Sequence, residues 1–259
     1  MIYRPPWRLI PFLNASGAEQ MAIDAWLLRE YLPQAGRSVL RFYGWGPAAI
    51  SLGCFQKSWP EAWQHLTWQG KPIELVKRPT GGRSVLHQGS LTYSVVMPRG
   101  NQKRQTLYPC ICQFLIRAWQ TLGIPLTFGS GGRGYIHNPS CFNTATAADL
   151  VAPDGSKLIG SAQRQTQTGL LQHGSMVWDT DRHLFEQVFQ QPAPWQHSLA
   201  ALTENIPLSD IVSVLVTSAA DHFQSDLTPQ PLTDSEWTAI AAYVKAFQIE
   251  ENRGLPSPH

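Results

Sequence analysis

Short apolar segments alternate with longer periodic ones along this chain, which predicts a protein that mixes strands and helices. Short apolar segments predict strands at 7–12, 39–43, 48–52, 73–76, 84–87, 91–96, 157–163 and 170–177, with another around Leu150. The segments at 84–87 and 91–96 are also rich in β-branched and aromatic residues. Apolar residues repeated every three or four positions predict helices at 16–30, 60–68, 107–122, 182–189, 208–223 and 235–247. The alternation indicates an α/β fold.

Two local signals define where particular elements begin. Ser16 stands three residues before Glu19, which is the capping-box pattern that starts a helix. Asp154 and Gly155 form a two-residue hairpin signal. The strand that follows this turn is therefore predicted to begin at Lys157.

Composition and charge narrow the class of protein. The 259 residues allow one large α/β domain, or one domain with an appendage, and a net charge of +2 is too balanced to indicate nucleic-acid binding. Four scattered cysteines show no zinc-binding spacing, and neither a signal peptide nor an apolar stretch of membrane-spanning length is visible. We therefore expect a cytoplasmic protein with reduced thiols and with neither a nucleic-acid nor a membrane partner.

A basic, glycine-rich loop follows one of the predicted strands. Gly81 and Gly82 allow positive φ angles and a close approach by a ligand. Lys77, Arg78 and Arg83 place three cations around them, which suits a phosphate, a carboxylate or a phosphopantetheine group. Alone, such a loop is more typical of a solvated hairpin turn.

A second run of polar and small residues lies further along the chain. Lys157 begins a predicted strand in which Gly160, Ser161 and Ala162 follow, and small residues inside a strand indicate that a ligand or another backbone comes close. A lysine in this position is either a ligand clamp or an edge-strand charge. The basic loop elsewhere in the chain favours the clamp.

Together these motifs resemble those of the biotin/lipoate protein ligase superfamily. Its lipoate-attaching members carry an R-R-x-[ST]-G-G-[GR]-x-V-x-H loop, matched here by residues 78–87 with Lys77 at the first position, and a K-x-x-G-S-A-Q strand, matched by 157–163. The likeness extends to 14–24, 40–47, 50–53 and 172–175, and so covers about residues 7 to 190. It implies a mixed, mostly antiparallel sheet with flanking helices.

The resemblance also implies that these motifs bind the acyl substrate. The residues concerned are Arg78, Thr80, Gly81, Gly82, Arg83, His87, Gly160, Ser161, Ala162, His173 and Gly174. The two histidines suit either proton transfer or structural hydrogen bonds, and the sequence leaves both roles open.

Cys141 lies between the two motifs and decides between two chemistries of the family. One group of its octanoyltransferases carries a C-F-[DE] element before the lysine strand, and this chain has Cys141, Phe142 and Asn143 there, with Asn in place of the acid. The resemblance implies that Cys141 takes an octanoyl group from acyl carrier protein as a thioester. It then passes the group to a lysine of a lipoyl domain or of the glycine-cleavage H protein, without metal or ATP. Lys157 is expected to favour the thiolate and to stabilise the oxyanion.

Three other activities stay open at this point. An ATP-dependent lipoate–protein ligase would use the same loop and Lys157 to bind an acyl adenylate. An octanoyl amidotransferase would keep Cys141 but take the acyl group from another lipoyl domain. A non-catalytic acyl- or carrier-binding protein would keep the pocket without chemistry.

The chain divides into two predicted parts. Residues 1–205 are expected to form the catalytic domain, and 206–259 a helical C-terminal extension of the same unit that ends in a disordered tail. The long ATP-dependent ligases of the family carry a separate C-terminal domain. The short extension here favours the transferase.

Overall fold

The fold is built on one large mixed sheet. The computed structural model describes residues 6–101, 103–129, 149–204 and 206–249. Eight strands follow in the order β13-β1-β2-β8-β12-β11-β10-β9. Their bounds are β1 Trp7–Ala15, β2 Val39–Trp45, β8 Leu91–Pro98, β9 Thr127–Phe128, β10 Leu150–Val151, β11 Lys157–Gln165, β12 Gly169–Met176 and β13 Leu227–Pro229.

Most neighbours in this sheet are antiparallel, whereas β1 runs parallel to both β2 and β13. A smaller three-stranded sheet has the order β6-β3-β7, and a hairpin forms a third sheet. The strands concerned are β3 Ala49–Leu52, β6 Glu74–Lys77, β7 Val85–His87, β4 Thr67–Trp68 and β5 Lys71–Pro72. The mixed, mostly antiparallel sheet implied by the family resemblance is confirmed.

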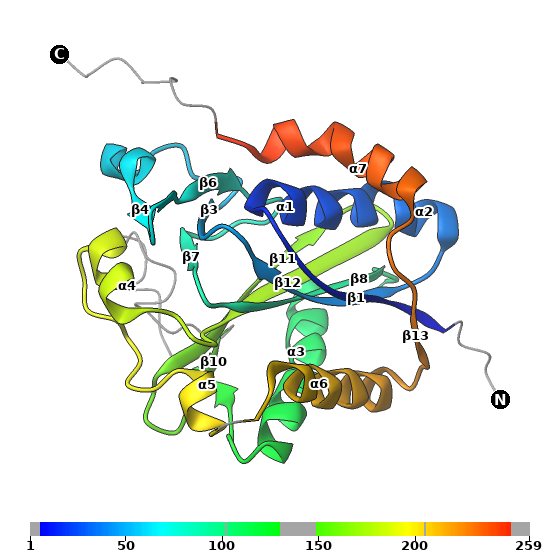
Figure 1. Ribbon diagram of the computed structural model, residues 1–259. Helices are drawn as coiled ribbons and strands as arrows, with labels where there is room; N and C mark the ends of the chain where they lie inside the picture. The colour runs from blue at the N-terminus through cyan, green and yellow to red at the C-terminus, as the bar shows by residue number, and fades with distance from the viewer. Residues whose placement is uncertain (1–5, 102, 130–148, 205, 250–259) are drawn as a thin grey trace.

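Helices cover both faces of the large sheet, as Figure 1 shows. One face carries α1 Gly17–Trp26 and α7 Asp234–Phe247, and the other carries α3 Arg104–Thr121 and α6 Leu208–Phe223. The shorter helices are a π-helical turn η1 Leu27–Tyr31, α2 Leu32–Ala35, a 3-10 turn η2 Glu61–His65, α4 Arg182–Phe189 and α5 Leu199–Leu202.

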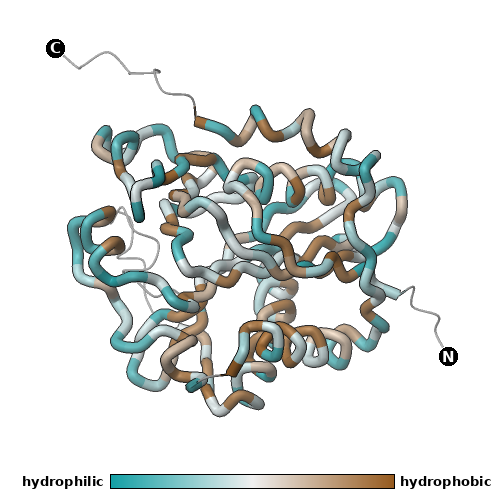
Figure 2. Tube along the Cα trace, in the orientation of Figure 1, coloured by the Kyte–Doolittle hydropathy of each residue, from teal (hydrophilic) through white to brown (hydrophobic). Residues whose placement is uncertain are grey.

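Successive side chains along a strand point to opposite faces of the large sheet, and apolar side chains form a hydrophobic core on each face. Leu170 belongs to the core under α3 and α6, whereas its neighbour Leu171 belongs to the core under α1 and α7. Phe42 and Tyr43 on β2 divide in the same way. Figure 2 shows apolar segments running through the central strands and through α6.

The predicted start of the first helix is confirmed, but its predicted end is not. Ser16 accepts from the Glu19 amide and the Glu19 side chain accepts from the Ser16 amide, so the capping box forms. The helical stretch continues through η1 and α2 and ends at Gly36, which takes the left-handed conformation with φ 62°. Pro33 lacks an N–H, which is consistent with a helical ladder that shifts to a π turn just before it.

The predicted helix at 60–68 is wrong. Residues Glu61–His65 form only a 3-10 turn, and the chain then enters the β4–β5 hairpin. Gln69 and Gly70 take positive φ angles of 49° and 75°, which is the geometry of a two-residue hairpin turn. The helical turn stops before this reversal, because Leu66 is already extended with ψ 139° and Thr67 and Trp68 pair with β5.

The stretch between the predicted helices at 208–223 and 235–247 contains a strand that was not predicted. Leu227–Pro229 forms β13, an edge strand parallel to β1. Pro229 is tolerated because an edge strand leaves one side of its backbone unpaired. The residues after 206 thus contribute a strand to the large sheet and a helix to each of its faces (Figure 1).

Candidate functional site

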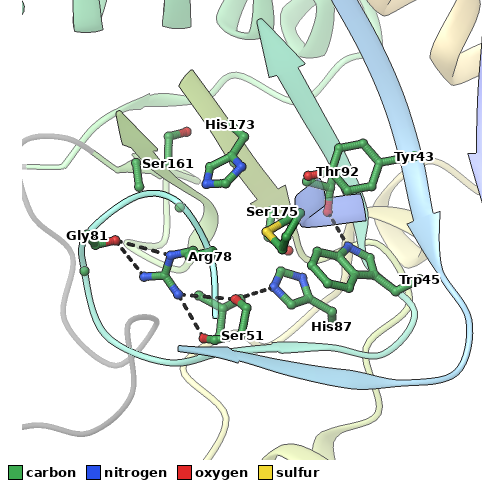
Figure 3. Close-up of a pocket in the computed structure, with 16 residues that line it drawn as sticks. Tyr43, Trp45, Ser51, Arg78, Gly81, His87, Thr92, Ser161, His173 and Ser175 are labelled. Carbon is green, nitrogen blue, oxygen red and sulfur yellow. Dashed lines mark hydrogen bonds between the residues drawn. The ribbon is translucent and has the colours of Figure 1, made fainter. Parts of the chain in front are cut away.

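The two sequence motifs meet at one cavity, shown in Figure 3. The loop after β6 forms one side, and the central parts of β11 and β12 form the other. The predicted binding residues that line it are Arg78, Gly81, Gly82, His87, Gly160, Ser161, Ala162, His173 and Gly174. Met21, Tyr43, Trp45, Val85 and Thr92 contribute further wall, so much of the lining is aromatic or aliphatic. A cavity of this kind suits an apolar chain.

Arg78 holds the loop in shape from within. Its side chain is buried, and its guanidinium donates to the carbonyls of Ser51 (2.9 Å), Gly81 (2.8 Å) and Arg83 (2.6 Å). It also donates to the Ser51 hydroxyl at 3.2 Å. These bonds account for the strict geometry of the loop, because a planar guanidinium presents its donors in a fixed fork.

Two loops meet backbone to backbone at the cavity. A Cβ placed on Gly53 would lie 1.9 Å from the Gly82 carbonyl oxygen, and the Cys54 amide donates to the Thr80 carbonyl at 2.9 Å. Gly82 itself has φ +97°, which other residues rarely adopt. Gly81 and Gly82 were predicted to let a ligand approach closely. In the structure, Gly82 instead lets the loop that contains Gly53 approach.

His87 lies on the cavity wall as a neutral ring. It stacks on Trp45 with ring centroids 3.6 Å apart, and its Nε2 lies 2.8 Å from the Ser51 hydroxyl. Burial, together with the nearby cation of Arg78, holds the pKa of His87 well below its usual value. Arg78 also donates to the Ser51 hydroxyl, and a ring with its proton on Nδ1, whose Nε2 accepts from Ser51, fits these contacts.

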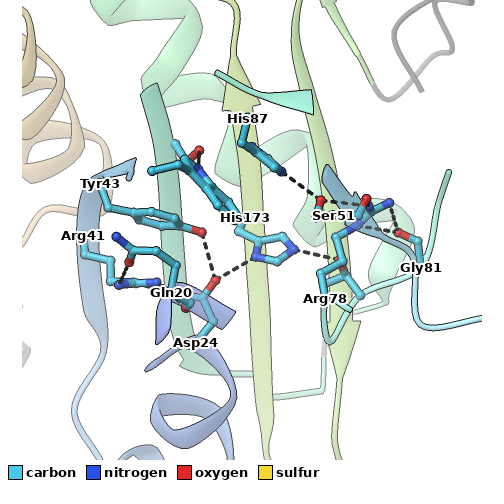
Figure 4. A network of polar contacts seen from close by, with 12 residues as sticks. Gln20, Asp24, Arg41, Tyr43, Ser51, Arg78, Gly81, His87 and His173 are labelled. Atoms are coloured by element: carbon cyan, nitrogen blue, oxygen red, sulfur yellow. Dashed lines mark hydrogen bonds and ion pairs between the residues drawn. The ribbon is translucent and has the colours of Figure 1, made fainter. Parts of the chain in front are cut away.

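His173 connects the cavity to a buried ion pair (Figure 4). Its Nε2 lies 2.7 Å from the Thr80 hydroxyl, and its Nδ1 lies 2.7 Å from Asp24 Oδ2. Arg41 donates to Asp24 Oδ1 at 3.0 Å, and the Tyr43 hydroxyl donates to Oδ2 at 3.2 Å. Thr80 thus contributes to the site through His173, although it is not among the described residues that line the cavity.

The Lys157 side chain is directed toward Asp149 and does not line the described cavity. Its ammonium lies 2.9 Å from Asp149 Oδ1, and the two side chains are 2% and 5% exposed. A register shift accompanies this placement, since Val151 pairs with Lys157 while the next residue back, Leu150, pairs with Ile159. Such a bulge re-aims a side chain. Lys157 does not belong to the cavity wall formed by the described part of the chain.

The predicted nucleophile Cys141 lies outside the described residues. The two residues that flank the segment 130–148 are hydrogen-bonded to each other, with the Gly129 amide donating to the Asp149 carbonyl at 2.9 Å. Asp149 also binds Lys157, so Gly129 and the Lys157–Asp149 ion pair are joined through one residue.

None of the three described cysteines lines the cavity. Cys110 is exposed on α3, and Cys54 is half-buried beside the Thr80 loop. Cys112 is buried, and burial raises the pKa of its thiol to about 12. A thiol in that environment stays protonated and unreactive.

Three residues of the site carried no individual prediction. Asp24 lies in a segment that matched the family, but its contact with His173 spans 149 residues of sequence. Asp149 precedes Lys157 in a stretch without a distinctive motif, and Ser51 is one of several serines in strands. The only sequence signal for Asp149 was its charge just before the short strand β10.

None of the helices in the described part of the chain combines the length and the apolar character needed to cross a membrane.

Comparison with known proteins gives consistent matches. A family model for the lipoyl protein ligase A/B catalytic domain matches residues 16–239. Octanoyltransferase LipM of Exiguobacterium sp. is 31% identical over 268 residues, which cover 95% of this chain and 96% of that protein. Octanoyltransferase LipM of Carboxydothermus hydrogenoformans is 38% identical over 179 residues, which cover 68% and 66%.

A solved structure has the same fold. The bipartite lipoate protein ligase of Thermoplasma acidophilum superposes with a TM-score of 0.75 over 93% of each chain. Its sequence identity of 18% restricts this likeness to the fold.

Proposed function

The chain belongs to the lipoyl protein ligase A/B catalytic-domain family, and we propose that within it the protein is an octanoyltransferase of lipoate assembly. The observation that carries this proposal is the similarity to octanoyltransferases along nearly the whole chain. The cavity supports it, because its aromatic and aliphatic walls suit a medium-length acyl chain.

The proposed first step uses the Cys141 thiolate. It attacks the carbonyl carbon of the octanoyl thioester on acyl carrier protein, so that a carbon–sulfur bond forms to Cys141 and the bond to the carrier thiol breaks. The carrier leaves as a thiol after taking up a proton. One thioester replaces another, so the step is close to balanced in free energy and needs no ATP.

The proposed second step transfers the group to an amine. The ε-amine of a lysine on a lipoyl domain, or on the glycine-cleavage H protein, attacks the Cys141 thioester. A carbon–nitrogen bond forms, the carbon–sulfur bond breaks, and the amine proton returns to the sulfur. The step is favourable because an amide is more stable than a thioester.

Lys157 supplies positive charge in this scheme. A cation near Cys141 would favour the thiolate, and it would stabilise the oxyanion of each tetrahedral intermediate. Its buried pairing with Asp149 supports such a role, because a buried ammonium persists only beside a compensating charge. Asp149 is thus proposed as the partner that keeps this cation in place.

The experiment that tests the proposal is intact-protein mass spectrometry after mixing the protein with octanoyl-acyl carrier protein in the absence of ATP. We expect an octanoyl adduct that hydroxylamine removes and that Cys141→Ala abolishes. Cys110→Ala is the matched control, because it removes an exposed thiol on α3 and should leave the adduct unchanged.

Two results would contradict the proposal. An adduct that survives Cys141→Ala would remove that residue from the chemistry. ATP-dependent attachment of free lipoate or octanoate to a lipoyl domain, with no adduct from the carrier, would make the protein a ligase instead.

A further inference from the structure

A chain of three buried side chains runs from helix α1 to the loop over the cavity. Asp24, His173 and Thr80 are joined by contacts of 2.7 Å between Asp24 Oδ2 and His173 Nδ1, and 2.7 Å between His173 Nε2 and the Thr80 hydroxyl. All three residues are at most 5% exposed. They come from α1, β12 and the loop after β6, so the contacts connect elements that are far apart in sequence.

The Asp24 end of this chain is rigid. Burial raises the pKa of Asp24, but the attraction of Arg41 and the contacts with His173 outweigh it and lower the pKa overall. Asp24 is therefore a carboxylate, and a carboxylate can only accept, so His173 Nδ1 carries the proton. Arg41 is itself held by the Gln20 side chain at 2.8 Å and by the Gln20 carbonyl at 2.8 Å (Figure 4).

The Thr80 end lies where the cavity wall begins. The next two residues, Gly81 and Gly82, line the cavity, and the Thr80 carbonyl accepts from the Cys54 amide at 2.9 Å. Arg78 fixes the loop from within. Two side chains of the large sheet also hold it: His173 on β12 through the Thr80 hydroxyl, and Arg164 on β11 through a bond of 3.2 Å to the Pro79 carbonyl. The loop is thus attached to the sheet at the point where it turns over the cavity.

We propose that His173 is a positioning residue, which acts through the Thr80 hydroxyl to hold the wall formed by Gly81 and Gly82 against the bound acyl chain. The proposal rests on the acyl-binding role given to this cavity under the proposed function. It assigns Asp24 to the orientation of the ring, and it gives His173, which also lines the cavity, a task besides direct contact with the acyl chain.

Thr80→Val tests the proposal most directly. Valine has nearly the same shape as threonine but lacks the hydroxyl, so His173 Nε2 would face a methyl group and the attachment would be lost. The loop would then have to become ordered each time an acyl chain binds. We expect the Kd for octanoyl-N-acetylcysteamine to rise about tenfold, which corresponds to one lost buried hydrogen bond. Thr80→Ser keeps the hydroxyl and should restore the wild-type Kd.

Binding is best measured by calorimetry in a Cys141→Ala background, so that no turnover occurs. Hydrogen exchange at the Cys54 amide gives a second readout, since its acceptor is the Thr80 carbonyl. Thr80→Val should accelerate this exchange without any ligand, and Thr80→Ser should not. Thr203→Val is the matched control, because Thr203 is also buried and donates to a carbonyl, that of Leu199 at 2.9 Å.

The possible results test separately the attachment of the loop, its link to acyl binding, and the octanoyltransferase function. Two results would overturn the attachment of the loop by His173. One is a Cys54 amide that exchanges at the wild-type rate in Thr80→Val, and the other is exchange that is accelerated as much in Thr80→Ser as in Thr80→Val. Faster exchange with an unchanged Kd would overturn its link to acyl binding. A wild-type protein that binds the thioester but transfers nothing would contradict the octanoyltransferase function alone, because neither readout requires transfer.

Discussion

Lys157 and Asp149 form a buried ion pair, with 2.9 Å between Nζ and Oδ1. The pair lies beside the residues that flank the segment containing Cys141, since the Asp149 carbonyl accepts from the Gly129 amide. Lys157, which was predicted from a motif, therefore has an acidic partner in the residue directly before strand β10. This relationship makes Asp149 a target for mutation.

Asp149→Asn should lower both stability and activity. The amide keeps the shape of the carboxylate but leaves the Lys157 charge without this compensation in a buried site, which costs about 3 kcal/mol in comparable pairs. We expect a lower urea midpoint and at least a tenfold slower formation of the octanoyl adduct. Asp149→Glu, which keeps the charge, should recover part of both. Full adduct formation by Asp149→Asn would exclude the pair from the reaction.

His87 should remain neutral over the physiological pH range. Burial and Arg78 hold its pKa well below the usual value, and its Nε2 lies 2.8 Å from the Ser51 hydroxyl, which we infer to be the donor. In nitrogen-15 NMR spectra we expect an unprotonated Nε2 and no titration of this ring between pH 6 and pH 8. A ring that titrates near pH 6.5 would contradict the hydrogen-bond direction inferred from Arg78 and Ser51.

The same depressed pKa predicts how stability depends on pH. Below the unfolded-state pKa of about 6.5, the unfolded chain binds a proton at His87 that the folded protein does not, so the free energy of unfolding falls with falling pH. The contribution approaches about 1.4 kcal/mol per pH unit between the unfolded and the folded pKa. His87→Gln should remove it, which urea denaturation of both proteins from pH 7 to pH 5 would measure.

The lowered pKa of Asp24 predicts that the free energy of unfolding falls at more acidic pH. Its folded-state pKa is lowered, so its contribution to stability is present above the unfolded value of about 3.9 and is lost as pH falls through the folded value. Asp24→Asn should abolish this dependence below about pH 4. It should also cost about 3 kcal/mol at pH 7, because Arg41 would keep its charge without a carboxylate. A variant as stable as wild type at pH 7 would contradict this reading of the ion pair.

The sequence predicted the elements whose patterns are local. Ser16 and Glu19 signal the start of α1, and the turn at Asp154 and Gly155 signals the start of β11 at Lys157. The helix predicted at 60–68 failed because Thr67 and Trp68 pair with β5 in a hairpin, and the turn of that hairpin at Gln69 and Gly70 needs a positive φ that glutamine seldom signals.

Residues of the candidate site could be predicted only where they belong to a sequence motif. Arg78 and His173 were found through their motifs, but the tasks that the structure gives them depend on distant partners. Arg78 binds carbonyls of its own loop and of Ser51, and His173 binds a carboxylate 149 residues away in the chain. Contacts of this kind follow from how the sheet brings strands together, which no local pattern encodes.

Gly53→Ala should separate the two loops that meet at the cavity. Its Cβ would lie 1.9 Å from the Gly82 carbonyl oxygen and 2.9 Å from the Gly82 carbonyl carbon, and backbone atoms cannot move aside as a flexible side chain can. The loops would have to part, which would weaken the bond from the Cys54 amide to the Thr80 carbonyl. We expect a loss of about 2 kcal/mol in the free energy of unfolding, typical of overpacking, and faster hydrogen exchange at Cys54.

Gly81→Ala is the matched control for this change in stability. A Cβ on Gly81 would lie 3.6 Å from the Phe55 ring, which is ordinary van der Waals contact, and its backbone does not require a positive φ. Its stability should therefore stay within about 0.5 kcal/mol of wild type. Equal losses in the two variants would mean that the glycines serve loop flexibility in general, whereas a loss confined to Gly53→Ala would trace it to the single contact between Gly53 and Gly82.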